Sequence, residues 1–162
     1  MRPLLTALTA LMLFATPVVA GDWEDGVDAV KAGDYQKAFR LFKPLAEQGN
    51  LLAQTALGFM YRGGQGVPKD SATVAQWFRA AAEQGSMIAQ ASLDLLYGLG
   101  EGVPQNNLQA YAWVSSAAAQ GNEDAKNDIG IIREQMTIAQ IAEAQKLSSE
   151  LWEKYVVPFQ KD

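Results

Sequence analysis

Apolar and small residues return along the chain at intervals of 36 positions. Phe42, Phe78 and Val114 are spaced in this way, and several other positions keep the same interval. These are Ala46, Ala82 and Ala118, then Gly49, Gly85 and Gly121, then Ala53, Ala89 and Ala125, and finally Leu57, Leu93 and Ile129. Because the large apolar, alanine and glycine classes stay in step over three units, the pattern predicts a tandem structural repeat.

Each unit is predicted to form two helices, which we call the A helix and the B helix. Asp34, Asp70 and Asn106 can cap the three A helices, since their side-chain oxygens can accept from free N–H groups of the first turn. The glycine of each Gln-Gly pair then stands where a left-handed residue ends the A helix. The B helices are predicted at about 51–62, 86–98 and 122–135. Gly-x-Gly-Val-Pro segments after the first two turn the chain back.

Residue size predicts how these hairpins pack. Trp77 and Phe78 lie one turn before the small residues Ala81 and Ala82, and the third unit keeps this arrangement. A large ring from one helix can therefore fill the space over an alanine on a neighbour. Because one hairpin cannot bury all of these side chains, the hairpins are expected to stack. The sequence thus predicts an all-α solenoid of about three helix-turn-helix repeats.

Two further segments are predicted to be helices that cap the ends of the solenoid. Residues 22–33 place Trp23 and Val27 at helical spacing. Near the other end, Thr137 and Gln140 form the sequence of a capping box, which begins a helix that continues to about residue 155. The buried stripe of that helix is predicted to consist of Ile141, Leu147, Leu151 and Tyr155.

Residues 1–20 have the pattern of a cleavable signal peptide. Arg2 precedes an apolar run that begins at Leu4, and Val18 and Ala20 fit the −3 and −1 positions of a signal peptidase site. The run is shorter than the roughly 20 residues of a transmembrane helix. We therefore expect cleavage after Ala20, a periplasmic or secreted product, and no stable membrane insertion after cleavage.

The overall composition is that of a globular protein. The chain has 162 residues, of which 49% are hydrophobic and 19% charged. Without Arg2, the basic count falls from 13 to 12 against 18 acidic residues, which gives a net charge of −6. Such a surface repels nucleic acid and anionic lipid, so neither is expected as a partner. Because the chain has no cysteine, stability has to come from packing.

The residues that could carry chemistry favour structural roles. Histidine and cysteine are absent, which removes the catalytic triads that use them and most zinc sites. Glu123 and Asp124 form one of the densest acidic clusters, and they stand in the first turn of a predicted helix, where the dipole favours them. The Gly-x-Gly segments lack the Gly-Lys-Ser/Thr ending of a phosphate loop. The sequence therefore predicts no catalytic residue, no cofactor and no metal site.

The repeated motifs resemble the SEL-one-like repeat family, a relative of the tetratricopeptide repeats. The resemblance rests on Ala81-Ala82-Glu83-Gln84-Gly85, on Ala-Gln, Leu-Gly and Tyr positions of the B helices, and on the Gly-x-Gly-Val loops. It covers about residues 33–135. Two departures are Asp94, which replaces the usual glycine after Leu93 and implies a looser contact there, and Arg133, which replaces a tyrosine. The resemblance implies a right-handed α/α superhelix whose A helices line the inner face.

The resemblance also implies protein–protein interaction. The domain is predicted to span residues 21–162, and the chain is expected to be an exported scaffold or adaptor that binds a protein or peptide on the concave face. A cell-wall ligand binder or hydrolase, related to cysteine-rich family members, is the alternative, and a purely structural or regulatory role stays open. The predicted segments are repeats at about 34–69, 70–105 and 106–136 and a capping helix at 137–156.

Candidate partner-binding residues are exposed positions on the first two A helices. They are Lys37, Arg40, Lys43, Gln76 and Arg79. Four of these five are basic although the chain is acidic, so the local charge differs in sign from the whole. Such a patch would attract an acidic segment of a partner. A plain solvated face is the other interpretation of the same residues.

Overall fold

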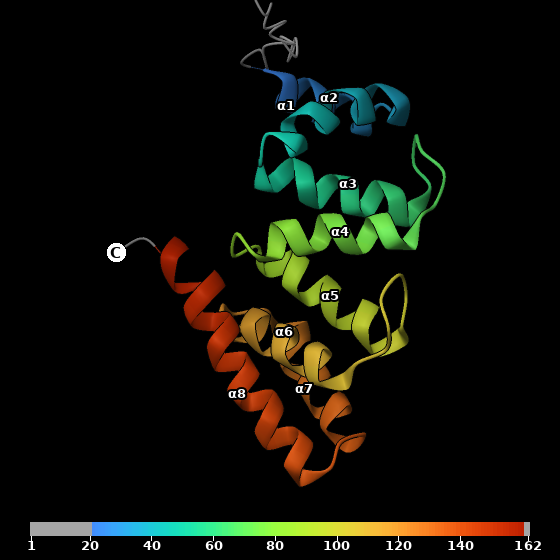
Figure 1. The fold of residues 1–162 in the computed structure, drawn as a ribbon. Coiled ribbons are helices and arrows are strands. Elements are labelled where there is room, and N and C mark those ends of the chain that lie inside the picture. The colour runs from blue at the N-terminus through green and yellow to red at the C-terminus, as the bar shows by residue number, and fades with distance from the viewer. Residues whose placement is uncertain (1–20, 161–162) are drawn as a thin grey trace, which may run out of the picture.

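The structure is a computed structural model that describes residues 21–160, so the predicted signal peptide lies outside the described residues. This part of the chain contains eight α-helices, one short 3₁₀ turn and no strand. The helices are α1 Asp22–Lys31, α2 Tyr35–Glu47, α3 Leu51–Gly63, α4 Ser71–Ala82, α5 Met87–Leu99, α6 Asn107–Ala119, α7 Glu123–Glu134 and α8 Ile138–Tyr155, and the turn η1 is Val157–Phe159. The A helices are α2, α4 and α6, and the B helices are α3, α5 and α7. Figure 1 shows α1 to α7 stacked one on the next in chain order.

The helix ends form as the sequence predicts. Asp34 accepts a hydrogen bond from the backbone N–H of Lys37 at 3.0 Å, and Asp70 and Asn106 each accept from two backbone N–H groups. Hydrogen bonds from Thr73 to the carboxylate hold the pKa of Asp70 below its usual value. The three predicted left-handed glycines after the A helices are confirmed, with φ angles between +85° and +102°. Local chemistry therefore sets the helix boundaries.

The Gly-x-Gly-Val loops depend on close contact between two backbones. The second loop places Gly102, at φ +72°, against the carbonyl oxygen of Ser71, and a Cβ there would collide with it. One repeat earlier, Gly66 meets the carbonyl of Tyr35 in the same way. Since Ser71 begins α4 and Tyr35 begins α2, each loop is pressed against the start of the A helix in its own repeat.

Replacing Gly102 by alanine should destabilise the protein by about 2 kcal/mol or more. The left-handed conformation alone costs an L-residue about 1–2 kcal/mol, and the backbone contact adds to it. Chemical denaturation of the variant measures the loss. Gly130→Ala is the matched control, because Gly130 lies inside α7 with open space around its Cβ position. That change should be neutral or stabilise by up to about 1 kcal/mol, and equal losses in both variants would contradict the loop argument.

Hydrogen bonds between a half-buried and a buried glutamine connect one repeat to the next. The Gln84 amide donates to the side-chain oxygen of Gln54 at 2.7 Å, and Gln54 in turn donates to the backbone carbonyl of Ala46 at 3.2 Å. The pair recurs one repeat later, where Gln120 donates to Gln90 at 2.7 Å. Because each amide is satisfied by its neighbour, polar side chains at the A–B junctions can be buried without loss.

A contact between a phenylalanine ring and a glycine joins α1 to α2, and another joins α3 to α4. Gly26 of α1 lies against the ring of Phe42 on α2, and Gly58 of α3 lies against the ring of Phe78 on α4. Both rings are fully buried. Only glycine leaves room for a ring at this distance from the helix backbone, so the packing of successive repeats depends on these two positions.

The third contact of this series is built differently. On α5, Asp94 stands at the position of Gly58, and on α6, Val114 stands at the position of Phe78. Asp94 is larger than glycine and Val114 is smaller than phenylalanine, so the two changes have opposite effects on the total side-chain volume of the pair. Although the sequence implies a looser contact here, both side chains are buried, and Asp94 is only 4% exposed.

The last helix departs from the register of the repeats. The capping box is confirmed, with Thr137 and Gln140 each bonding the other's backbone at the start of α8. A fourth repeat would place α8 on α7, but α8 packs mainly on α6 and runs obliquely back along the stack (Figure 1). The prediction for its buried stripe is only partly right. Ile141, Leu147, Leu151 and Tyr155 are half-buried, and the fully buried residue is Ala144, whose small side chain permits a close approach.

The two tryptophans that match in the repeat have different surroundings. Trp113 on α6 is 1% exposed and stacks on Tyr155 at a centroid distance of 5.8 Å. Trp77 on α4 is only half-buried and packs against the first core cluster. The expectation that large rings of the A helices fill the space between helices is therefore confirmed for Trp113 and only partly for Trp77, because Tyr155 covers only the third A helix.

Candidate partner-binding surface

The five residues predicted to bind a partner all lie exposed on α2 and α4. Arg40 and Gln76 occupy equivalent positions of two repeats, as do Lys43 and Arg79. These two pairs form two short rows across α2 and α4, and Lys37 lies on α2 three residues before Arg40. We call the exposed surface made by these five residues the A-face patch.

Some of the basic residues of the A-face patch already have acidic neighbours. Lys43 lies 3.9 Å from Glu47, and the guanidinium of Arg79 lies 4.0 Å from Glu83. Arg79 also donates a hydrogen bond to the Tyr97 hydroxyl and lies 5.7 Å from the centre of that ring. This contact is not visible in the pattern of the A helix, because Tyr97 belongs to the B helix of the repeat.

Two basic residues of the patch are unpaired. Within residues 21–160, Lys37 and Arg40 have no ion pair. Both are exposed on α2. Lys37 has no direct ion pair but lies near enough to Asp28 for its charge to help lower the pKa of that carboxyl. Exposed cations without a direct ion pair keep most of their attraction for an incoming anion, and salt screens that attraction. Lys37 and Arg40 are therefore the members of the patch best placed to attract an acidic segment.

The two rows continue onto α6, where α8 changes their surroundings. The position of Arg40 becomes Ala112, which is fully buried. The position of Lys43 becomes Ser115, which lines a pocket between α6 and α8. The pocket has a volume of about 240 Å³ and is lined by Ser115, Ser116, Ala119, Ser148, Ser149, Trp152 and Glu153. Sequence reasoning missed it, since the repeat pattern does not extend to α8.

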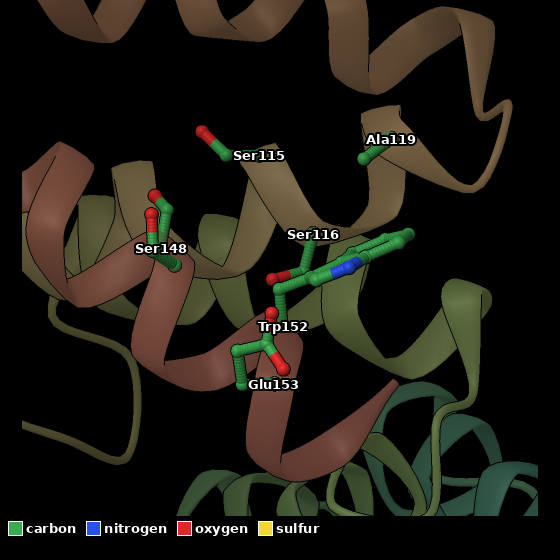
Figure 2. Close-up of a pocket in the computed structure, with 7 residues that line it drawn as sticks. Ser115, Ser116, Ala119, Ser148, Trp152 and Glu153 are labelled. Carbon is green, nitrogen blue, oxygen red and sulfur yellow. The ribbon is translucent and has the colours of Figure 1, made fainter. Parts of the chain in front are cut away.

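The pocket offers apolar contact and hydrogen-bond acceptors. Figure 2 shows Trp152 beside Ser116, at the place where α6 and α8 meet. The hydroxyls of Ser116, Ser148 and Ser149 each donate to a backbone carbonyl one turn earlier in their own helix, at 2.9–3.2 Å. Their oxygens can still accept a hydrogen bond from a ligand. The seven residues therefore provide a small, partly apolar recess with hydroxyl acceptors.

The C-terminal end of α8 borders the patch on α4. The Tyr155 carbonyl and Phe159 lie close to Gly85, in the turn after α4. A hydrogen bond and charge interaction with Tyr155 raise the pKa of Lys154, and Glu83, which directly follows α4, adds to the rise. The face of the A helices is thus open at α2 and α4 and covered at α6.

Within residues 21–160, no three or more aspartate, glutamate, histidine or cysteine side chains are grouped so as to hold a metal ion. None of the helices in this range is both long enough and apolar enough to span a membrane.

Comparison with known families finds the same repeat. The Sel1 repeat model matches residues 20–50, 51–86 and 89–122. The three matches cover α1 with α2, α3 with α4, and α5 with α6. The matched units are therefore shifted by one helix from the hairpins predicted at 34–69, 70–105 and 106–136. Since a solenoid can be divided at either junction, the positions of the repeat boundaries stay a prediction.

Solved structures show the same architecture. The chain is similar to a protective antigen of uropathogenic Escherichia coli strains that displays an SLR fold, with 32% identity, a TM-score of 0.81, and coverage of 85% of this chain and 30% of that one. A Sel1 repeat protein from Oxalobacter formigenes matches with 28% identity and a TM-score of 0.66, over 80% of this chain and 55% of that one. The predicted all-α right-handed superhelix of helix-turn-helix repeats is confirmed.

The chain spans 30% and 55% of the lengths of these two proteins, so it corresponds to only part of each. The search of curated proteins finds no significant match. Sel1 repeat proteins generally act as scaffolds for protein–protein interaction. Because the family model covers more than half of the chain and the solved structures share its fold, this chain belongs to the Sel1 repeat family.

Proposed function

We propose that this protein is an exported scaffold that binds an acidic segment of a protein partner on the A-face patch. The observation that carries the proposal is the charge of the patch. Four of its five exposed residues are basic in a chain with a net charge of −5. The family supports a protein as the partner, and the signal-peptide pattern of residues 1–20 supports a periplasmic or secreted location.

The A-face patch and the pocket between α6 and α8 would have different roles in binding. Lys37 and Arg40 on α2 supply unpaired positive charge, which steers an acidic segment and sets its orientation. Toward α6 the positive charge ends, and the pocket beside Trp152 and Ser115 offers an apolar wall and hydroxyl acceptors, with the carboxylate of Glu153 in its lining. A bound segment would place carboxylates over α2 and a largely apolar side chain in the pocket.

The Lys37→Glu/Arg40→Glu double variant tests the proposal. We expect it to bind an acidic peptide at least about tenfold more weakly than the parent, since two attractive charges become repulsive. The probe is a fluorescein-labelled 12-residue peptide of alternating glutamate and leucine, measured by anisotropy at low salt and at high salt. Binding by the parent should weaken at high salt. Arg79 is left intact in this variant, because its contact with Tyr97 contributes to packing.

Lys146→Glu is the matched control for this variant. Lys146 is 80% exposed on α8, away from the patch, and its ion pair with Glu150 is long at 4.0 Å. This variant should bind the acidic peptide like the parent, and all three proteins should melt at similar temperatures. If the double variant binds as tightly as the parent, the patch is not the interface.

A further inference from the structure

A second exposed surface follows the B helices and is apolar. Phe59, Leu95 and Ile131 are spaced by 36 residues on α3, α5 and α7, and their side chains are 41%, 42% and 58% exposed. Leu99 on α5 is 65% exposed. Single exposed apolar residues are common, but a row that repeats on successive B helices indicates a surface that contacts another molecule.

Part of this row lines a groove between α5 and α7. One cavity of about 210 Å³ has Leu95, Leu99 and Ile131 in its wall, together with Asp94 and Asp128. A second cavity of about 230 Å³ shares Leu95 and Asp128 with it and extends the space to Ile88 and Asp124. We call the two cavities together the B-face groove. From Ile88 to Leu99 it follows about three turns of α5.

Asp94 is an acid without a partner whose side chain lines this groove. Only 4% of it is exposed, and within the part of the chain that the structure describes it makes no hydrogen bond and no ion pair. Burial raises the pKa of Asp94 to about 7, with a further contribution from the charge of Asp128. A buried carboxylate is costly unless a cation or hydrogen-bond donors compensate it.

The repeat itself does not require an acid here. The equivalent position in α3 is Gly58, which packs against a phenylalanine ring. The neighbours of Asp94 do not compensate it either. The sequence of α6 contains no charged residue, the charged group of α7 that acts on Asp94 is Asp128, and Arg79 of α4 is bonded to Tyr97. The groove thus has apolar walls, the acidic pair Asp94 and Asp128, and Asp124 further along it, and none of these three acids has an ion pair within residues 21–160.

We propose that the B-face groove binds an apolar segment of a partner protein that carries one lysine or arginine, whose cation lies between Asp94 and Asp128. The apolar side chains of the segment cover Leu95, Leu99 and Ile131, and its cation supplies the charge that Asp94 lacks. The occupant is opposite in sign to the acidic segment proposed for the A-face patch. The two surfaces therefore take different ligands, and this proposal stands apart from the first.

The test uses designed peptides, so that the ligand chemistry is known. The probe is a labelled 12-residue amphipathic peptide with leucines on one face and one central lysine. The matched peptide has norleucine in place of the lysine. At pH 8 we expect the lysine peptide to bind the full-length mature protein at least tenfold more tightly than the norleucine peptide. The lysine peptide should also bind more tightly at pH 8 than at pH 5.5, as Asp94 ionises, whereas the norleucine peptide should not.

Protein variants show whether Asp94 is responsible. Asp94→Asn should reduce the affinity for the lysine peptide at least tenfold and remove its pH dependence. Asp94→Gly, which restores the residue of the earlier repeat, should have the same two effects. Glu143→Gln, an exposed acid on α8, is the control and should bind like the parent. The Lys37→Glu/Arg40→Glu variant should also bind like the parent, which separates this result from that on the A-face patch.

Three results would overturn the proposal. They are equal affinities for the lysine and norleucine peptides, unchanged affinity in Asp94→Asn, and no binding of the lysine peptide up to millimolar concentration. Sedimentation of the protein alone adds a fourth, because a dimer broken by Asp94→Asn would show that a second copy of this chain occupies the groove instead.

Discussion

Replacing Trp113 by alanine should lower the free energy of unfolding by about 3–5 kcal/mol, the usual range for a buried tryptophan. Trp113 is 1% exposed, belongs to the larger core cluster and stacks on Tyr155 of α8. The truncation therefore removes core packing of the third repeat and a contact that holds α8. Urea denaturation measures the loss, and limited proteolysis should show earlier cleavage around α8.

Trp77→Ala is the matched control for this prediction. Trp77 holds the equivalent position on α4 but is only half-buried, so its loss should cost clearly less than that of Trp113. Trp113→Phe should also destabilise the protein less than its loss of side-chain volume alone would suggest. The Trp113 Nε1 group is buried without an acceptor in the described chain, and phenylalanine removes that unsatisfied donor. Equal losses for the two alanine variants would mean that α8 does not cover Trp113 in solution.

The parts of the fold that the sequence predicts correctly depend on short-range rules. A cap such as Asp70 and a left-handed turn residue such as Gly85 act within a few positions of themselves, and the 36-residue interval repeats them. The docking of α8 on α6 has no such signal, because it occurs once and breaks the register. The pocket beside Trp152 arises from that docking, and for this reason no residue of it was among the predicted site residues.

The candidate sites show the same division. Exposure of Lys37 and Arg40 follows from their places on an amphipathic helix, so the sequence predicts it. The contact of Arg79 with Tyr97 joins an A helix to a B helix, and a pattern along one helix does not report it. Asp94 is visible in the sequence as a departure from the repeat. Its burial does not follow from that departure, because the pattern along one helix does not report which side chains of α6 and α7 lie around it.

Replacing Asp94 by asparagine should stabilise the protein, and the gain should grow with pH. The pKa of Asp94 is raised to about 7 in the folded protein, from an ordinary value of 3.8. The folded state therefore holds this proton more tightly than the unfolded state does. Below pH 4 both states are protonated and the carboxyl carries no penalty. Between about pH 4 and pH 7, stability falls as the pH rises, and above pH 7 the full penalty is present.

The size of this effect follows from the same pKa difference, which corresponds to as much as about 4 kcal/mol above pH 7. Asparagine has nearly the same shape and no charge, so Asp94→Asn should recover most of that at pH 8 and almost nothing at pH 4. For a chain of this length the gain at pH 8 amounts to a rise in Tm on the order of 10 °C. Melting both proteins at each pH from 4 to 8 measures the difference, in which contributions from other carboxylates cancel.

Asp128→Asn provides the comparison for Asp94→Asn. Asp128 is half-buried on α7 and contributes less than burial does to the raised pKa of Asp94. Its replacement should stabilise the protein in the same pH range but by a smaller amount, because Asp94 stays buried. A stability difference between Asp94→Asn and the parent that is the same at pH 4 and pH 8 would show that Asp94 is not held in the apolar environment described here. Without that environment, a cationic segment would gain nothing from reaching it, so the pH profile also bears on the B-face groove.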